Sequence, residues 1–389
     1  MTTRREFLQA AGAAATLGVV PWPACAAADW KRLLILVELK GGNDGLNTVV
    51  PFADAAYARL RPRIGMARDA VLQLDAGTGL HPSLAPLMPL WQGEELAVVQ
   101  SVGYPQPNLS HFRSIEIWDT ASKSDQYLRE GWLARAFAAE APPRRFVADG
   151  VVIGAADLGP LTGARAVAMT GPDQFQRLAR LAQAHEALQA TSGRSVNMAL
   201  QHLLAIEGDV ASAAVRISAA PVLRTAFPAG AFGDAVKSAC EVAGGGRGVA
   251  ALRLSLSGFD THHNQSNTHA NLLRQLAEGL VALRAGLTEL GRWNDTLVMT
   301  YAEFGRRPRE NQSGGTDHGT AAPHFVLGGC VRGGLYGEAP KLDRLDGNGN
   351  LPFSIDYRSL YATVLEKWWG VSANAVLGGK FPAMDWVRG

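Results

Sequence analysis

Short apolar runs alternate along the chain with longer segments in which apolar residues recur every three or four positions. The short runs are rich in Val, Ile and Leu, which is typical of β-strands. They cover residues 32–39, 95–102, 248–257, 296–302 and 324–329. Helical periodicity covers residues 84–93, 110–122 and 267–293. Strands that alternate with helices predict an α/β fold, with a mainly parallel sheet covered by helices on both faces.

The middle of the chain has a different pattern. Residues 172–245 are helical almost throughout in their periodicity, and we interpret them as covering helices rather than as an insertion. His185 and His202 lie on the amphipathic helices of this segment and are expected on their surface or in their packing. The chain has 389 residues, of which 47% are hydrophobic, so a single large α/β domain over residues 29–389 is expected.

The first 28 residues have the pattern of an export signal. Arg4 and Arg5 precede a short alanine-rich apolar stretch, and small residues at 24–28 offer a cleavage site. The arginine pair resembles a twin-arginine (Tat) signal, which predicts export through the Tat machinery to the periplasm. An ordinary secretory signal is the alternative. No later segment reaches the roughly 18 uncharged apolar residues that a membrane span needs, so no stable membrane insertion is expected.

Charge and cysteine content exclude several classes of protein. The net charge is +2 and no basic stripe occurs, which excludes a nucleic-acid partner on electrostatic grounds. Of the three cysteines, Cys25 lies in the expected signal, and Cys240 and Cys330 alone form neither a disulfide framework nor a thiolate metal site. Any metal site in the mature chain must therefore use oxygen and nitrogen ligands.

Polar residues with catalytic or metal-binding chemistry follow several of the predicted strands or lie in the loops between elements. In open parallel sheets, ligands bind beyond the carboxyl ends of the strands. The residues at this predicted edge are Asp44, Ser110, Asp260 with His262, Glu303, and Asp317 with His318. Because carboxyl ends of parallel strands meet at one edge, we expect these side chains to converge.

Each of these positions also has a purely structural interpretation. Asp44 in "GGNDG" fits a turn as well as a ligand. Ser110 fits the N-cap of the helix that follows it. It also fits a nucleophile, because a helix N-terminus offers free N–H groups to an anion. Asn108, Arg113 and Arg306 are candidates for holding an anionic substrate, and the two arginines also fit solvated charges or surface salt bridges.

Histidines supply the remaining candidate ligands. In "FDTHHNQ" (259–265), Asp260 and His262 are the expected ligands and His263 is the reserve. Asp317 and His318 lie on a glycine-rich loop, where an acid and an imidazole have little reason to pack. His324 is either a further ligand or a histidine at a strand end, and Glu303 is a further reserve ligand.

Long motifs make the chain resemble the DUF1501 family. They are "LKGGNDGLNTVVP" (39–51), "HPSLAPL" (81–87), "NLSHFRSIEIW" (108–118), "FDTHHNQ" (259–265), "TYAEFGRRPREN" (300–311) and "GGTDHGTAAPHFVLGG" (314–329). That family is grouped with the alkaline phosphatase and sulfatase superfamily. The resemblance implies a three-layer α/β/α sandwich around a site for one or two metal ions.

The resemblance also implies roles for individual residues. Asp44 would bind a second metal, together with Asp317 and His318, and Ser110 would be the nucleophile. Asp260 would hold the first metal with His262 or His263. The chain departs from the phosphatase pattern D-x-x-x-H, because Asn264 stands four residues after Asp260. It departs from the sulfatase pattern as well, because His111 and Phe112 follow Ser110.

These features favour a metal-dependent hydrolase of a phosphate or sulfate ester in which Ser110 attacks the substrate. One or two divalent ions are expected, Zn²⁺ or Mn²⁺ in preference to Mg²⁺ or Ca²⁺, and the substrate is a small anionic ester or a glycan. The alternative is a non-catalytic periplasmic protein of the same fold that binds a metal, a glycan or a partner. A redox enzyme is excluded, because the chain has neither a G-x-G-x-x-G motif after a strand nor a cysteine cluster.

Overall fold

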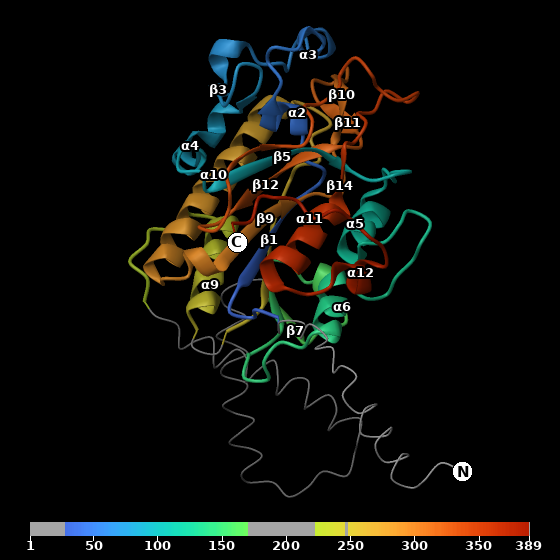
Figure 1. Ribbon diagram of the computed structural model, residues 1–389. Coiled ribbons are helices and arrows are strands. Elements are labelled where there is room, and N and C mark those ends of the chain that lie inside the picture. The colour runs from blue at the N-terminus through green and yellow to red at the C-terminus, as the bar shows by residue number, and fades with distance from the viewer. Residues whose placement is uncertain (1–27, 170–221, 246–247, 389) are drawn as a thin grey trace, which may run out of the picture.

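The computed structural model describes residues 28–169, 222–245 and 248–388, and these build a nine-stranded sheet between two layers of helices (Figure 1). The strand order is β13-β5-β12-β9-β1-β8-β6-β7, and β14 pairs with β5. In chain order the strands are β1 (Leu33–Lys40), β5 (Leu96–Gly103), β6 (Gly150–Ile153), β7 (Ala166–Met169), β8 (Ala251–Ser257), β9 (Thr296–Tyr301), β12 (Ala322–Leu327), β13 (Gly334–Tyr336) and β14 (Ile355–Asp356).

The sheet is mainly parallel, as the alternation of strands and helices predicts. β1 is parallel to both of its neighbours, with Leu34 opposite Ala251 of β8 and Leu297 of β9. β12 is the exception, because it is antiparallel to β5 and to β9. β5 and β9 therefore run in the same direction as β1 and β8, and these four strands end at the same edge.

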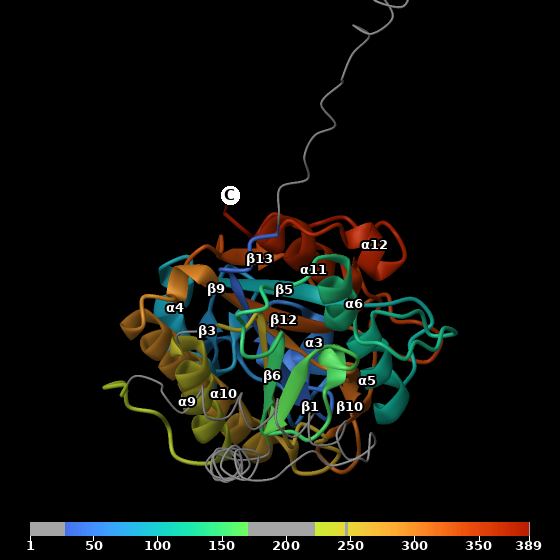
Figure 2. The ribbon, with the colours of Figure 1, turned by 90° about the horizontal axis from the view of Figure 1, so that it is seen from below.

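Helices cover both faces of the sheet, which confirms the predicted sandwich (Figures 1 and 2). One face is covered by η2 (Pro82–Leu87), α4 (Met88–Gln92), α9 (Ala231–Gly244) and α10 (Gln265–Glu289). The other face is covered by α5 (His111–Thr120), α6 (Trp132–Ala139), α11 (Tyr357–Thr363), η5 (Val364–Trp369) and α12 (Ala373–Leu377).

The continuous apolar run of β1 explains why the strand needs cover on both sides. Side chains alternate between the faces of a strand. Ile35 and Val37 belong to the core beneath α9 and α10, whereas Leu34 and Leu36 belong to the core beneath α5 and α11. All four side chains are fully buried or nearly so, so each face of β1 contributes to a separate hydrophobic core.

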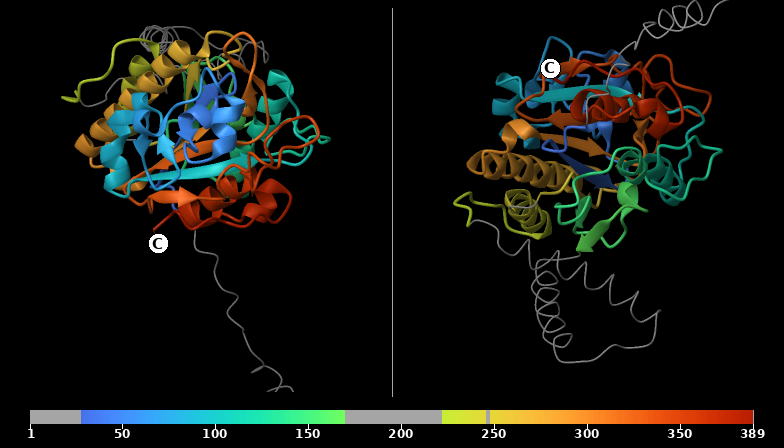
Figure 3. Two further views of the ribbon diagram at one scale, coloured as in Figure 1. Left: turned by 90° about the horizontal axis from the view of Figure 1, so that it is seen from above. Right: turned by 60° about the horizontal axis from the view of Figure 1, so that its bottom comes forward.

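Smaller elements gather beyond the carboxyl ends of the main strands, at the top of Figure 1 and toward the viewer in the left view of Figure 3. They include a two-stranded sheet of β10 (Arg306–Glu310) and β11 (Thr316–His318). A three-stranded sheet consists of β2 (Val49–Val50), β4 (Gly79–Leu80) and β3 (Leu72–Gln73). The short helices in this region are α2 (Gly45–Thr48), α3 (Ala55–Leu60) and η1 (Arg68–Ala70). Two further short helices lie elsewhere: η3 (Gly159–Leu161) lies between β6 and β7, and η4 (Trp293–Asp295) directly precedes β9.

Two predictions from the sequence lie largely outside the described residues. Almost all of the expected signal at residues 1–28 lies outside the described residues. Most of the helical segment 172–245, including His185 and His202, also lies outside them. The end of that segment forms α9. Within the part of the chain that the structure describes, no helix is long and apolar enough to span a bilayer.

Candidate metal centre

Three side chains from distant parts of the chain meet at the carboxyl edge of the sheet. One ligand atom from each of His111, Asp260 and His318 can be chosen so that all lie within 4.8 Å of one another. His111 begins α5, Asp260 follows β8, and His318 ends β11. This spacing is that of a metal site.

The loop that carries Asp260 packs directly against the loop after β1. Gly41 has a φ of 116°, a conformation that glycine adopts without strain. A Cβ at Gly41 would collide with the backbone of Asp260. Gly41, the first glycine in "KGGNDG", therefore allows the two strand-end loops to approach closely, and this contact fixes the position of the Asp260 carboxylate.

Glu303 orients the ring of His111. Its Oε1 lies 2.8 Å from His111 Nδ1 and accepts a hydrogen bond from the Gly41 backbone N–H at 2.9 Å. A carboxylate bonded in this way places the imidazole proton on Nδ1, because the oxygen accepts. The opposite nitrogen, His111 Nε2, lies 3.4 Å from Asp260 Oδ2 and is left as the ligand atom.

His318 presents the same nitrogen to Asp260. Its Nδ1 lies 2.9 Å from the backbone carbonyl of Leu109, which can only accept, so this nitrogen carries the proton. Nε2 lies 3.2 Å from Asp260 Oδ1. Burial lowers the pKa of His318, although its hydrogen bond to the Leu109 carbonyl partly offsets this effect, so the ring is neutral at neutral pH. Two unprotonated imidazole nitrogens therefore face one carboxylate.

A cluster of this kind consists of acceptor atoms alone and is stabilised by a cation at its centre. Imidazole nitrogen with carboxylate oxygen is a donor set for Zn²⁺ and also suits Mn²⁺. His262 adds a further imidazole, with Nε2 at 3.0 Å from Asp260 Oδ1 and 3.1 Å from His318 Nε2. The residues present therefore fit a divalent ion.

Arg306 holds Asp260 in place, which differs from the substrate-binding role that the sequence suggests. Its buried guanidinium donates to the backbone carbonyls of Gly41, Gly42, Phe259 and Thr316. Nη2 also lies 2.6 Å from Asp260 Oδ1. Although burial raises the pKa of Asp260, the hydrogen bond and the charge of Arg306 lower it to about 2. Each nitrogen of Arg306 has a protein partner, so its role is to position the ligand loops.

Asp317 and His263 lie at the border of the cluster. Asp317 Oδ1 is 3.5 Å from His262 Nδ1, so Asp317 contacts the cluster through the His262 ring. Asn311 supports both, because its amide donates to Asp317 Oδ1 at 3.2 Å and to the His262 carbonyl at 2.9 Å. His263 is exposed, and its ring centre lies 6.3 Å from that of His262.

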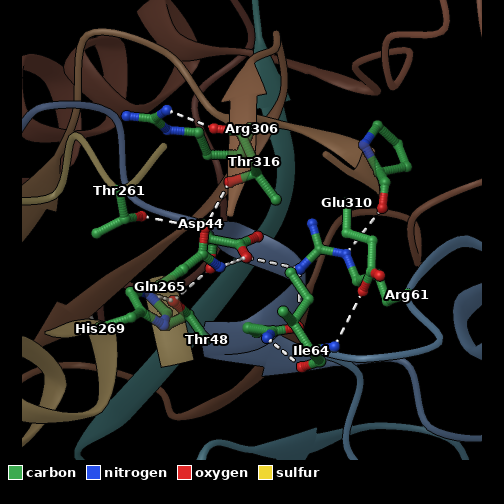
Figure 4. Close-up of polar contacts among 12 residues, drawn as sticks. Asp44, Thr48, Arg61, Ile64, Thr261, Gln265, His269, Arg306, Glu310 and Thr316 are labelled. Carbon is green, nitrogen blue, oxygen red and sulfur yellow. Dashed lines mark hydrogen bonds and ion pairs between the residues drawn. The ribbon is translucent and has the colours of Figure 1, made fainter. Parts of the chain in front are cut away.

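The structure does not bring Asp44 into the cluster. Its fully buried carboxylate forms an ion pair with Arg61, with Oδ2 at 2.6 Å from Nη1, and accepts a further hydrogen bond from Gln265 (Figure 4). Burial raises the pKa of Asp44, but the charge and the hydrogen bond of Arg61 bring it below its ordinary value. Asp44 is therefore an ionised residue whose charge is balanced by an arginine.

The structure places Ser110 at the N-cap of α5, where its side chain is exposed. Asn108 fixes this turn, because its Oδ1 accepts from the Ser110 backbone N–H at 2.8 Å. The residues on either side of Ser110 both touch the cluster, Leu109 through its carbonyl to His318 and His111 through its ring. Ser110 therefore lies at the edge of the candidate metal centre.

Arg113 and His324 have other surroundings. The guanidinium of Arg113 donates to the carbonyls of Lys123, Ser124 and Gln126 and lies 3.9 Å from the centre of the Tyr127 ring. It holds this loop rather than facing the cluster. His324 lies within β12, where its ring packs edge-on against Trp118 at 5.2 Å between centroids. Burial lowers the pKa of His324 to about 3.

The family model for DUF1501, described as a protein of unknown function, matches residues 66–378. The chain belongs to the DUF1501 family. No match was found among curated proteins. The match of this DUF1501 protein to its family model includes His111, Asp260, Glu303 and His318 and leaves out Asp44 and Arg61.

The DUF1501 protein is also similar to solved structures at low identity. One is a protein in the alkaline phosphatase superfamily from Vibrio parahaemolyticus, at 12% identity and a TM-score of 0.42, covering 97% of this chain and 78% of that one. Another is the C-terminal periplasmic domain of EcEptC from Escherichia coli in complex with Zn, at 9% identity and a TM-score of 0.39, covering 76% and 72%. A third is the alkaline phosphatase of the Antarctic bacterium TAB5, at 11% identity and a TM-score of 0.33, covering 79% and 94%.

In this DUF1501 protein, His111 was not among the ligands predicted from the sequence, where it counted only as the residue after Ser110. An imidazole on the first turn of a helix at the ligand edge is nevertheless a signal for a ligand. What decides its role is Glu303, whose carboxylate comes from the end of β9 and turns the His111 ring toward Asp260. Local sequence cannot supply that contact.

Proposed function

We propose that this DUF1501 protein is an exported, metal-dependent hydrolase of a phosphate or sulfate ester. The observation that carries the proposal is the convergence of His111, Asp260 and His318 as acceptor atoms beside an exposed serine. A bound divalent ion would supply Lewis acidity toward an ester oxygen. The half-exposed carboxylate of Asp260, with 47% of its side chain accessible, leaves the cluster open to a substrate from solvent.

Ser110 is the nucleophile in this proposal. It stands at the N-terminus of the ten-residue helix α5, where free backbone N–H groups and the helix dipole favour an anion. The contacts of Leu109 with His318 and of His111 with Asp260 hold the serine beside the cluster. An anionic ester bound at the cluster would therefore meet both the helix N-terminus and a hydroxyl group.

The residues around the cluster fix the protonation and the orientation of the ligand side chains. Glu303 holds the proton of His111 on Nδ1, and the Leu109 carbonyl does the same for His318. Arg306 keeps Asp260 ionised and stationary. These contacts orient the ligand atoms before a substrate arrives, which is how second-sphere groups support metal sites.

A non-catalytic protein that binds a metal, a glycan or a partner is the second candidate. It is favoured by one observation: within the described residues, the hydrogen bonds of Ser110 involve its backbone, and its hydroxyl contacts no base. In that case the cluster would bind an ion without turning over an ester.

An activity assay with a serine variant tests the proposal. Protein loaded with Zn²⁺ or Mn²⁺ is assayed with aryl phosphates and aryl sulfates, and Ser110→Ala is compared with Ser266→Ala, an exposed serine on α10. We expect hydrolysis by the wild type and by Ser266→Ala, and a loss of orders of magnitude in kcat for Ser110→Ala. Equal activity of both variants removes Ser110 as the nucleophile. Metal binding without hydrolysis in the wild type favours the binding protein.

A further inference from the structure

A second charged network lies next to the metal cluster and is centred on Asp44 and Arg61. Both side chains are 0% exposed, and Arg61 Nη1 lies 2.6 Å from Asp44 Oδ2. The rest of the guanidinium is also occupied, by Asn47 Oδ1 at 2.8 Å and by the carbonyls of Pro308 at 2.8 Å and Arg307 at 3.1 Å. The arginine is therefore fixed in place and cannot turn away from Asp44 without losing all of these bonds.

Gln265 joins this pair to the segments that carry the metal ligands (Figure 4). Its amide nitrogen donates to Asp44 Oδ2, the oxygen that also receives Arg61. Its Oε1 accepts from Thr261 Oγ1 at 3.1 Å and from Thr316 Oγ1 at 2.7 Å. Thr261 follows Asp260 directly, and Thr316 shares β11 with His318. The network thus connects Asp44 to both sides of the cluster.

The other oxygen of Asp44 is buried and has no hydrogen-bond partner among the described residues. Such an oxygen suits a cation, but the surroundings of Asp44 do not complete a site. A divalent ion needs several protein ligands, and Asp44 belongs to no group of three or more acids, histidines or cysteines in the described ranges. The nearby His269 already contacts Asn43 Oδ1 through Nε2 at 2.9 Å.

The charge of Arg61 also disfavours a cation at Asp44. A divalent ion on Asp44 would lie beside a guanidinium that is always protonated, in a buried environment where repulsion between like charges is weakly screened. The pairing already neutralises the carboxylate. Asp44 therefore does not fit the role of ligand to a second ion, which the resemblance to metal-dependent phosphatases implies.

We infer that the centre holds one divalent ion, and that Arg61 supplies beside Asp44 the positive charge that a second ion would otherwise bring. The inference rests on the proposed metal centre. Asp44, Arg61 and Gln265 then act as positioning residues, which hold the loop after β8 and the strand β11 in register with each other.

Counting bound ions tests this inference. Purified full-length protein is stripped with a chelator, titrated with Zn²⁺ alone and freed of excess ion, and zinc per chain is measured by elemental analysis and native mass spectrometry. The wild type is compared with Asp44→Asn, with His318→Ala and with Asp234→Asn, which changes an exposed acid on α9. We expect one ion per chain in the wild type, in Asp44→Asn and in Asp234→Asn, and none in His318→Ala.

Two ions per wild-type chain, or a lower count in Asp44→Asn than in Asp234→Asn, would overturn the inference. The wild-type count decides the question by itself, so the test stands if Asp44→Asn fails to fold. Two ions leave the proposed hydrolase intact and refute only the role of Arg61. A wild-type chain that binds no Zn²⁺ refutes the metal centre and the proposed function together.

Discussion

The carboxylate of Glu303 lies 2.8 Å from His111 Nδ1, on the opposite side of the imidazole from Asp260. Glu303 is buried, with 2% of its surface exposed, and comes from the end of β9. A carboxylate behind a histidine fixes the ring and raises the basicity of the nitrogen that faces the metal. In the proposed metal centre, this contact would orient His111 as a ligand before the ion binds.

Glu303→Gln is expected to weaken Zn²⁺ binding about 10- to 100-fold, because the neutral amide supports the His111 ring less well than the carboxylate does. The measurement is a titration in the presence of a competing chelator. Glu278→Gln, which changes a partly exposed acid on α10 paired with Arg274, is the matched control and should bind as the wild type does. Equal affinities of the two variants would show that Glu303 does not act on the metal centre.

Removing Arg306 should destabilise the protein even without metal. Arg306→Ala leaves several carbonyls and Asp260 without their donor, and we expect the free energy of unfolding to fall by about 2–4 kcal/mol. Denaturant unfolding in the presence of EDTA measures this effect on the metal-free forms. Arg309→Ala, an exposed position on the same strand β10, should change stability by less than about 0.5 kcal/mol. Similar losses in the two variants would contradict the positioning role of Arg306.

His324 gives the folded state a specific dependence on pH. Burial lowers its pKa to about 3 in the folded protein, from an ordinary value of 6.5. Between these values the unfolded chain binds a proton that the folded chain does not, so this contribution to stability is lost as the pH falls from about 6.5 toward 3, by at most about 1.4 kcal/mol per pH unit.

His324→Leu should therefore show a shallower loss of stability than the wild type between neutral pH and about pH 4. The measurement is the midpoint of denaturant unfolding as a function of pH. His263→Leu makes the same change at an exposed histidine and should keep the slope of the wild type. A His324→Leu variant with the wild-type slope would show that the buried ring does not resist protonation.

The fold was accessible from the sequence because its signals are local. The strands β1, β5, β8 and β9 are rich in Val, Leu, Ile and Ala, and nearly all of their residues are buried, because the sheet is covered on both faces. The same reasoning placed Asp260 and His262 at this edge, because both follow the parallel strand β8. Asp317 and His318 were expected on a glycine-rich loop, whereas they belong to β11 of the antiparallel two-stranded sheet. It could not reveal the antiparallel direction of β12, which depends on pairing with β5 and β9.

The partners of charged residues were not accessible in this way. Asp44 in a glycine-rich turn fits a ligand as well as it fits one half of a buried ion pair, and only the packing of α3 and the loop after it brings Arg61 to it. Arg306 likewise carries no sign in the sequence that its guanidinium is buried among carbonyls. Such roles depend on contacts between segments that are distant in sequence.

The central claim is that His111, Asp260 and His318 hold a divalent ion, and the most direct measurement is calorimetric titration of Zn²⁺ into the metal-free protein. The wild type should bind with a dissociation constant in the micromolar range or below. His111→Ala and His318→Ala should keep their circular dichroism spectra and lose most of this affinity. Wild-type binding in both folded variants, or no Zn²⁺ binding by the wild type, would contradict the account.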